Sequence, residues 1–198
     1  MCSAAHVYAG ALDTEGQAAF EPCGLCHEYD GNPRMSHTPV IAGQWPAYMK
    51  KQLLDYRAGK RHGDMDGTVD TTSDQDIDEA VRYFSQQQPR QGNSDGISAA
   101  EKVLARKLFN EGDARRGTIA CLNCHGLEGH GTLIAPRIAG QHQDYLLNQL
   151  LEFKSGARRN DPTGKMRNAI KYLRKDELRA LAGYVSSLPA KSYMEVTH

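Results

Sequence analysis

The sequence predicts an all-α protein made of two similar halves. Segments of the first half recur 97 positions later, and apolar residues in both halves follow helical rather than alternating spacing. Gly or Pro residues end the apolar runs, as they do at helix ends, and no convincing strand pattern appears. The 198 residues are enough for one large domain or two small ones.

The repeat covers most of each half. Residues 39–44 match residues 136–141, and residues 52–59 match residues 149–156, both at an offset of 97. Tyr83-Phe84-Ser85 and Tyr184-Val185-Ser186 match at an offset of 101, so the second half has four extra residues between these segments. We therefore expect the same set of helices twice.

The first helix of each half is predicted from its ends. Pro46 suits a first helical turn, apolar residues follow at helical spacing, and Gly59 stops the helix. Residues 142–155 repeat this pattern and end before Gly156. The last helices are predicted at 74–87, capped by Ser73, and at 176–188.

A linker and a further helix follow the first half. Residues 89–96 are rich in Gly, Asn and Ser, which favours a linker. Ser98 and Glu101 form a capping box, which predicts a helix through about residue 109. The expected organisation is a leader remnant at 1–9, an N-terminal domain at 10–88, the linker at 89–96 and a C-terminal domain at 97–198.

Each half contains one Cys-x-x-Cys-His run, at residues 23–27 and 121–125. The spacing lets two thiols bond to the vinyl groups of one porphyrin while the adjacent imidazole reaches the iron. The sequence thus predicts two covalently attached haem c groups, on Cys23 and Cys26 with His27, and on Cys121 and Cys124 with His125. Structural zinc is the alternative, but it explains neither histidine.

Covalent haem attachment implies a periplasm-like compartment. Val7-Tyr8-Ala9 resembles the end of a cleavage site, so residues 1–9 are expected to lie outside the fold. The remaining Cys2 is interpreted as an incidental thiol, with lipid attachment as the alternative. No apolar stretch approaches the roughly 18 residues that span a bilayer.

The duplication selects the second axial ligand of each iron. Met65 and Met166 coincide at the offset of 101 and are assigned as the ligands opposite the motif histidines, with His62 as the rival in the first half. When the two repeats are aligned, Met35 and Met49 fall at or near leucines of the second half, which favours packing roles for both methionines. Histidine–methionine ligation fills both axial positions and suits electron transfer. Pro39 and Pro136, just after the motifs, are candidates to bind the histidine N–H through their carbonyls.

With these motifs, the chain resembles the dihaem cytochromes c4 over roughly residues 13–188. The resemblance implies two class I cytochrome c domains related by a pseudo-twofold axis, with haems facing each other across the interface. Members are periplasmic electron carriers, often membrane-associated, that deliver electrons to terminal oxidases. The first half departs from the family at residues 28–30, where the family usually runs to a glycine, and in its short acidic loop around Met65.

Charge divides between the halves although the total is zero. Residues 1–99 carry 8 Lys+Arg and 14 Asp+Glu, giving −6, and residues 100–198 carry 16 and 10, giving +6. Acidic residues follow Met65, whereas basic residues surround Met166. We expect the two ends to dock partners of opposite charge. Nucleic-acid binding has no support in a neutral chain with haem motifs.

Three functions remain in competition. The leading one is an electron shuttle between a membrane quinol-oxidising complex and a terminal oxidase or reductase, not itself an enzyme. The second is a dihaem electron-transfer subunit of a larger enzyme such as a flavocytochrome c sulfide dehydrogenase. The third is a dihaem peroxidase or thiosulfate dehydrogenase, which would need a haem whose sixth ligand leaves or is Cys or His.

Overall fold

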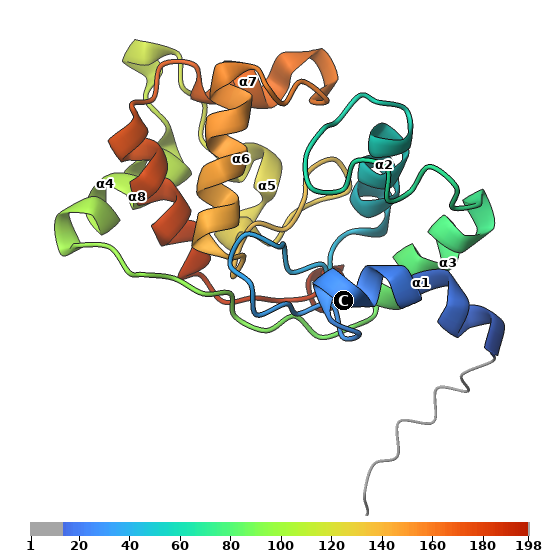
Figure 1. Cartoon of the computed structure of the whole chain (residues 1–198). Coiled ribbons are helices and arrows are strands. Elements are labelled where there is room, and N and C mark those ends of the chain that lie inside the picture. Colours follow the sequence, from blue (N-terminus) through green and yellow to red (C-terminus); the bar gives the residue numbers. More distant parts are fainter. Residues whose placement is uncertain (1–13, 198) are drawn as a thin grey trace, which may run out of the picture.

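Helices joined by loops make up the structure, and no strand occurs in the described part of the chain. The computed structural model describes residues 14–197, with side chains from residue 20 onward. Figure 1 shows the helices in two groups, α1, α2 and α3 on one side and α4, α6 and α8 on the other. The predicted all-α fold is confirmed. Residues 1–9, expected to be a leader remnant, and Cys2 lie outside the described residues.

The first half consists of α1 (Thr14–His27), α2 (Pro46–Arg57) and α3 (Asp74–Ser85). α2 begins at Pro46 as predicted and ends just before Gly59, which has a φ of 62°. α3 begins where the Ser73 side chain accepts a hydrogen bond from the Asp76 N–H at 3.1 Å. The apolar face of α3, which includes Ile77 and Phe84, forms the core with α1 and α2.

The second half has more elements. The capping box of Ser98 and Glu101 is present at the start of the first of them. Its α-helices are α4 (Ala99–Glu111), α5 (Leu122–His125), α6 (Gln143–Ser155), α7 (Lys165–Ile170), α8 (Lys175–Ser186) and α9 (Tyr193–Thr197). Short 3₁₀ turns lie at Ala114–Arg116, Leu127–Gly129 and Pro162–Gly164. α4 and α6 both pack against α8, whose buried face centres on Leu178 and Leu181.

The helices repeat at the offsets that the sequence shows. α2 and α6 begin 97 positions apart, and α3 and α8 have the same length and lie 101 positions apart. The extra residues of the second half form part of the segment that contains α7. α1 and α4 are equivalent in packing, because Phe20 stacks on Tyr83 at 4.0 Å and Phe109 contacts Tyr184 at 5.8 Å between ring centroids. α1 therefore combines the roles that α4 and α5 share in the second half.

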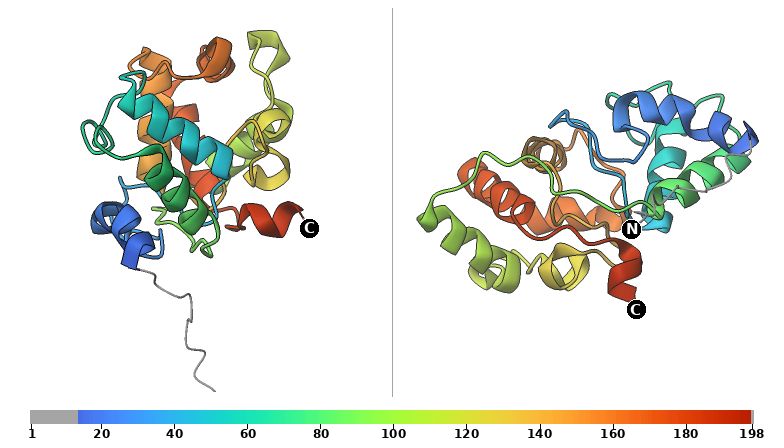
Figure 2. Two further views of the ribbon diagram at one scale, coloured as in Figure 1. Left: turned by 90° about the vertical axis from the view of Figure 1, so that its right-hand side faces the viewer. Right: turned by 90° about the horizontal axis from the view of Figure 1, so that it is seen from below.

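The two halves are joined by main-chain hydrogen bonds as well as by the covalent connection. The predicted linker runs along the boundary, where Gly92 N–H donates to Gly140 O at 2.8 Å. After α8 the chain returns along the boundary, as Figure 2 shows, and Tyr193 N–H donates to Gly43 O at 2.9 Å. A Cβ on Gly43 would lie 2.8 Å from Ser192, so only glycine allows this approach. None of the helices in residues 14–197 has the length and apolar character needed to cross a membrane.

Candidate functional site

The two motif histidines have matching hydrogen bonds. His27 ends α1 and His125 ends α5. The Nδ1 atom of His27 lies 3.0 Å from Pro39 O, and that of His125 lies 2.9 Å from Pro136 O. A carbonyl only accepts hydrogen bonds, so Nδ1 is the protonated nitrogen in both rings. The contacts predicted for the two prolines are confirmed.

This arrangement leaves Nε2 of each ring as a lone-pair donor. Nε2 has no hydrogen-bond partner among the described residues, and both rings are buried, at 7% and 6% exposed. Burial lowers the pKa of His27 and of His125, which the bond to the proline carbonyl only partly opposes. Both imidazoles are therefore neutral at pH 7, the form that binds a metal.

None of the four motif cysteines forms a disulfide within the described residues. Cys26 is exposed and the other three are half-buried. Burial raises the pKa of the Cys121 thiol to about 11. Residues 20–197 contain no group of three His, Cys, Asp or Glu side chains that could hold a metal ion, so the two motifs do not combine into a zinc site.

Large apolar side chains are exposed beside both motifs. Soluble proteins seldom leave such side chains uncovered in clusters, and an attached porphyrin would cover apolar surface of this kind. They are Leu25, Tyr29 and Met35 in the first half and Ile119, Leu127, Leu133 and Ile134 in the second. Cysteines outside any disulfide, a neutral Nε2 and exposed apolar side chains beside each motif together fit a covalently attached haem in each half. Met35, expected to be a packing residue, is 46% exposed and packs in neither core cluster of the described residues, because it lies in the loop after the motif among these apolar side chains.

In the second half, the proposed methionine ligand lies on a short helix beside the core. Met166 lies in α7 and packs against the same core cluster as Cys121. The proposed ligand and the attachment cysteine thus approach one core from different elements. Met49, expected to be a packing residue, is buried at 7% exposed in the first core cluster.

The first half is less regular around its proposed ligand. Cys23 packs against the first core cluster, but Met65 does not and is half-buried in a turn between α2 and α3. His62, the rival ligand, is 68% exposed by side chain and lies 3.4 Å from Asp66. The assignment of Met65 rests on its alignment with Met166.

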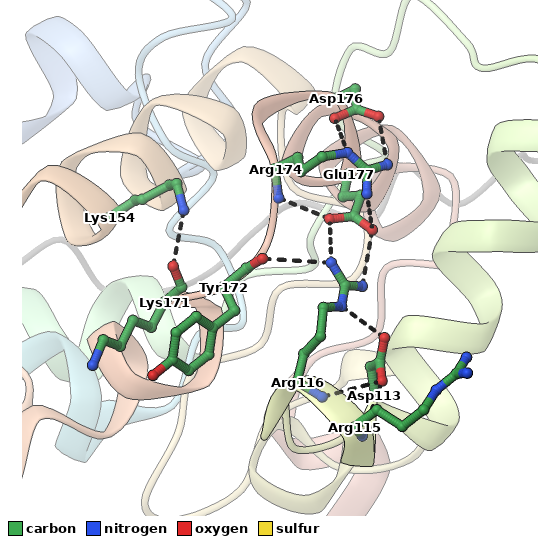
Figure 3. A network of polar contacts seen from close by, with 9 residues as sticks. All are labelled: Asp113, Arg115, Arg116, Lys154, Lys171, Tyr172, Arg174, Asp176 and Glu177. Carbon is green, nitrogen blue, oxygen red and sulfur yellow. Dashed lines mark hydrogen bonds and ion pairs between the residues drawn. The ribbon is translucent and has the colours of Figure 1, made fainter.

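A buried ion pair connects the haem-attachment side of the second half with the segment after α7. Figure 3 shows Arg116, from the turn before α5, between Asp113 and Glu177. Both terminal nitrogens of Arg116 lie 2.9 Å from the Glu177 carboxylate, and Nη1 also donates to Tyr172 O. Glu177 is 2% exposed and also accepts from the Arg174 N–H. This pair fixes the start of α8 relative to the approach to the motif.

Sequence reasoning missed the polar residues between the halves. Three side chains of the first half contact three side chains of the second half across the boundary: Tyr48, Gln52 and Arg61 on one side, and Tyr145, Gln149 and Arg158 on the other. The two tyrosines, the two glutamines and the two arginines each lie 97 positions apart, which is the offset of the repeat. That offset was the available signal, since duplicated polar residues on matching helices are candidates for a twofold interface.

Comparison with known proteins identifies the family. The family model for cytochrome c matches residues 104–189. The chain is 36% identical to cytochrome c4 of Stutzerimonas stutzeri, covering 87% of each chain, and 35% identical to cytochrome c4 of Azotobacter vinelandii, covering 93% of this chain and 91% of that one. It is also 30% identical to the thiosulfate dehydrogenase electron acceptor of Stutzerimonas stutzeri, over 90% of this chain and 85% of the relative.

A solved structure agrees with the sequence comparison. The crystal structure of reduced cytochrome c4 from Pseudomonas stutzeri superposes with a TM-score of 0.80 at 34% identity, covering 89% of this chain and 98% of that one. The fold, the duplicated motifs and the relatives agree, and the chain belongs to the cytochrome c4 family of dihaem electron-transfer proteins, with haem c bound covalently.

Proposed function

We propose that this dihaem cytochrome binds one haem through Cys23, Cys26, His27 and Met65 and the other through Cys121, Cys124, His125 and Met166. When bound, each haem iron supplies one-electron redox chemistry. Pro39 and Pro136 hold each ring by its Nδ1–H and direct Nε2 to the metal. The thioethers of Met65 and Met166 would supply the second protein ligand of each iron and would favour the reduced state.

The matched histidine geometry supports this proposal most strongly. Both rings are buried, neutral and bonded to the carbonyl of a proline 11 or 12 residues later. With Met65 and Met166 as ligands, neither iron would keep a position for a substrate, so we propose that the protein transfers electrons without acting as an enzyme. We propose the periplasm as its compartment, with peripheral membrane association. The proposed partners are a quinol-oxidising complex and a terminal oxidase or reductase.

Methionine variants test the ligands. Met166→Ala and Met65→Ala should each remove about half of the weak absorption band of methionine-bound ferric haem. Met194→Ala is the matched control, because Met194 lies in α9, outside the repeated helices, and its loss should leave the band unchanged. Full retention of the band in either ligand variant would disprove the corresponding assignment, and for Met65 would favour His62.

Opposite charges at equivalent positions support two docking surfaces. The acidic surface comprises Asp66, Asp70, Asp74, Asp76, Asp78 and Glu79, and the basic surface comprises Lys165, Arg167, Lys171, Arg174, Lys175 and Arg179. Ion pairs reduce the net charge of both surfaces: Arg57 pairs with Asp74 of the acidic surface, and Asp161 pairs with Arg167 of the basic surface. On the basic surface, Lys165, Lys171, Lys175 and Arg179 are exposed and form no ion pair within the described residues.

The basic surface therefore keeps unpaired positive charges that can steer an acidic partner. Acidic partners should associate with it at a rate that falls as ionic strength rises. Reversing Lys171 and Lys175 to Glu should slow transfer with such a partner, while reversing Lys102 and Lys107 on α4 provides the control. Transfer rates that do not respond to salt or to either reversal would remove docking by charge from the proposal.

Sulfur-compound oxidation is the second candidate context. The 30% identity to a thiosulfate dehydrogenase electron acceptor over 90% of the chain favours it specifically. In that context the chain would accept electrons from a sulfur-oxidising dehydrogenase, as the predicted electron-transfer subunit would. Rapid reduction of the purified protein by such a dehydrogenase, with no thiosulfate oxidation by the cytochrome alone, would support it.

A further inference from the structure

The sign of the charge reverses position by position between the two halves around the proposed methionine ligands. At the offset of 101 that aligns Met65 with Met166, five acidic residues of the first half fall on five basic residues of the second. The acidic set, in order, is Asp64, Asp66, Asp70, Asp74 and Asp78, and the basic set is Lys165, Arg167, Lys171, Lys175 and Arg179. The duplicated segments thus carry equal and opposite charge at equivalent positions.

The side chains of both sets are accessible from solvent. All five acidic residues are exposed, and so are all the basic residues except the half-buried Arg167. Asp74 and Asp78 lie one turn apart on α3, and Lys175 and Arg179 occupy the equivalent places on α8. The apolar residues of both helices are buried in the two core clusters. A molecule that approaches α3 or α8 from solvent therefore meets these charges.

Ion pairs within the chain leave most of this charge available. The acidic set forms three contacts with basic side chains of the described residues: Arg57 with Asp74, Lys50 with Asp78, and His62 with Asp66. The side chains of Asp74 and Asp78 nonetheless remain 79% and 54% exposed. The basic set forms one such pair, between Arg167 and Asp161. Both sets can therefore still pair with charges on another molecule.

A single molecule does not bring its two sets together. Figure 1 shows α3 and α8 on opposite sides of the molecule, and the view from below in Figure 2 agrees. α3 packs against α1 and α2, whereas α8 packs against α4 and α6. The opposite charges on these two helices therefore meet only when they belong to different molecules.

A second copy of the chain is the partner that this pattern favours. Because every position is negative on one set and positive on the other, the acidic set of one copy attracts the basic set of another wherever the two meet. The contact joins two different surfaces, so each copy keeps one set free for a further copy. Electron-transfer contacts are small and transient, and exposed charges without a large apolar patch suit them.

We propose that copies of this cytochrome associate head to tail, with the acidic set of one copy docked on the basic set of the next. This inference rests on the proposed electron-transfer function and names a partner for its two docking surfaces. Each set flanks the methionine that we propose as the iron ligand of its half. The contact allows an electron to pass between copies, with one copy oxidised as the other is reduced, so no further reactant is needed.

The salt dependence of self-association is the first test. Sedimentation velocity of the haem-loaded protein should show association that increases with protein concentration at about 0.01 M ionic strength. The same samples should be monomeric at about 1 M, because the Debye length decreases from about 30 Å to about 3 Å. A protein with two haems per chain that stays monomeric at low salt would refute the head-to-tail contact and leave the proposed electron-transfer function intact.

Two charge-reversed variants test the pairing itself. Asp70→Lys with Asp78→Lys alters only the acidic set, and Lys171→Glu with Arg179→Glu alters only the basic set at the equivalent positions. Each variant alone should associate at least about tenfold more weakly than the parent. A mixture of the two should form dimers and no larger species, because one variant keeps an intact basic set and the other an intact acidic set.

A matched control separates the pairing from the effect of net charge. Lys102→Glu with Lys107→Glu, at exposed positions of α4, changes the net charge as much as the basic-set reversal and should associate like the parent. Parent-like association of either reversed variant, or a mixture that stays monomeric, would contradict the head-to-tail contact. Salt-dependent electron transfer to another acidic protein would in that case assign the basic set to a different partner.

Discussion

Gln44 and Gln141 hold the two halves of the molecule together through the same pair of hydrogen bonds. Gln44 accepts from the Arg137 N–H at 2.8 Å and donates to Arg137 O at 2.9 Å. Gln141 accepts from the Val40 N–H at 2.8 Å and donates to Val40 O at 3.0 Å. All these groups are buried, so the repeated Ala-Gly-Gln segments are an interface motif.

Removing one of these amides should weaken the whole protein. Gln141→Leu leaves the buried Val40 N–H without a partner and the Val40 carbonyl with only the long contact from Arg137 Nη2 at 3.5 Å, which should lower the free energy of unfolding by about 3 kcal/mol. Chemical denaturation measures this change. Gln75→Leu, at an exposed position of α3, is the control, and its free energy of unfolding should stay within about 0.5 kcal/mol of the parent. A loss below about 1 kcal/mol for Gln141→Leu would contradict the role of the pair.

The first haem loop carries local strain that glycine should relieve. Glu28 follows His27 with a φ of 59°, whereas the corresponding residue after His125 is Gly126, with a φ of 74°. Glu28→Gly should raise the free energy of unfolding by about 1 kcal/mol, because side chains disfavour this conformation. Glu79→Gly in α3 is the control and should lower it by a similar amount. Destabilisation by Glu28→Gly would show that the Glu28 side chain has a compensating contact.

The buried ion pair of Figure 3 should matter far more than its exposed neighbour. Glu177→Gln removes the buried carboxylate charge that both terminal nitrogens of Arg116 contact and leaves Asp113 as the remaining carboxylate partner, so it should clearly lower the free energy of unfolding. Asp176→Asn removes an exposed partner of Arg174 and should lower it much less. Arg116 lowers the pKa of Glu177, so this stabilisation is present at neutral pH and decreases as the carboxylate is protonated. Equal costs for the two variants would contradict the burial argument.

His142 should make the interface sensitive to mild acid. Its Nδ1 accepts from the Asn93 N–H at 2.8 Å and its Nε2 donates to Pro33 O at 2.9 Å, which requires a neutral ring. Burial lowers the pKa of His142, although the Pro33 carbonyl and Asp144 oppose this. The unfolded chain therefore takes up the proton first, and the free energy of unfolding should fall as pH decreases below about 6.5.

A glutamine variant isolates this contribution. Gln can accept and donate as neutral His142 does but does not titrate. His142→Gln should therefore lose less stability than the parent between about pH 7.5 and about pH 5.5. Identical pH dependence in the two proteins would show that His142 is not the titrating group. His37→Gln, at an exposed histidine of the first half, controls for loss of any one imidazole.

Local signals in the sequence predicted most of the longer helices. The caps at Ser73 and Ser98 and the helix start at Pro46 appear where expected, because each depends on a few neighbouring residues. α7 was not predicted, since its N-cap, Gly164, has no side chain to mark the start. α1 was also not predicted, and Pro22 within it argues locally against a helix.

The sequence predicts the residues of the haem motifs better than the polar residues between the two halves. The motif spacing selected the cysteines and histidines that we propose to bind haem, and the contacts of the proline carbonyls were predicted correctly from their position in the loops. Local sequence patterns could not predict the contacts of Arg61 and Arg158. Each contact that crosses the boundary depends on how the two halves lie relative to each other. The repeat offset pairs these residues but does not show that they meet.

The coordination of the two irons is the central claim, and the spin state of the oxidised protein tests it most directly. Electron paramagnetic resonance of the purified ferric protein, with its haem content measured in parallel, should show two low-spin haems per chain that do not bind added cyanide rapidly. A high-spin haem, or rapid cyanide binding at either iron, would mean that one coordination position is open and would contradict the account.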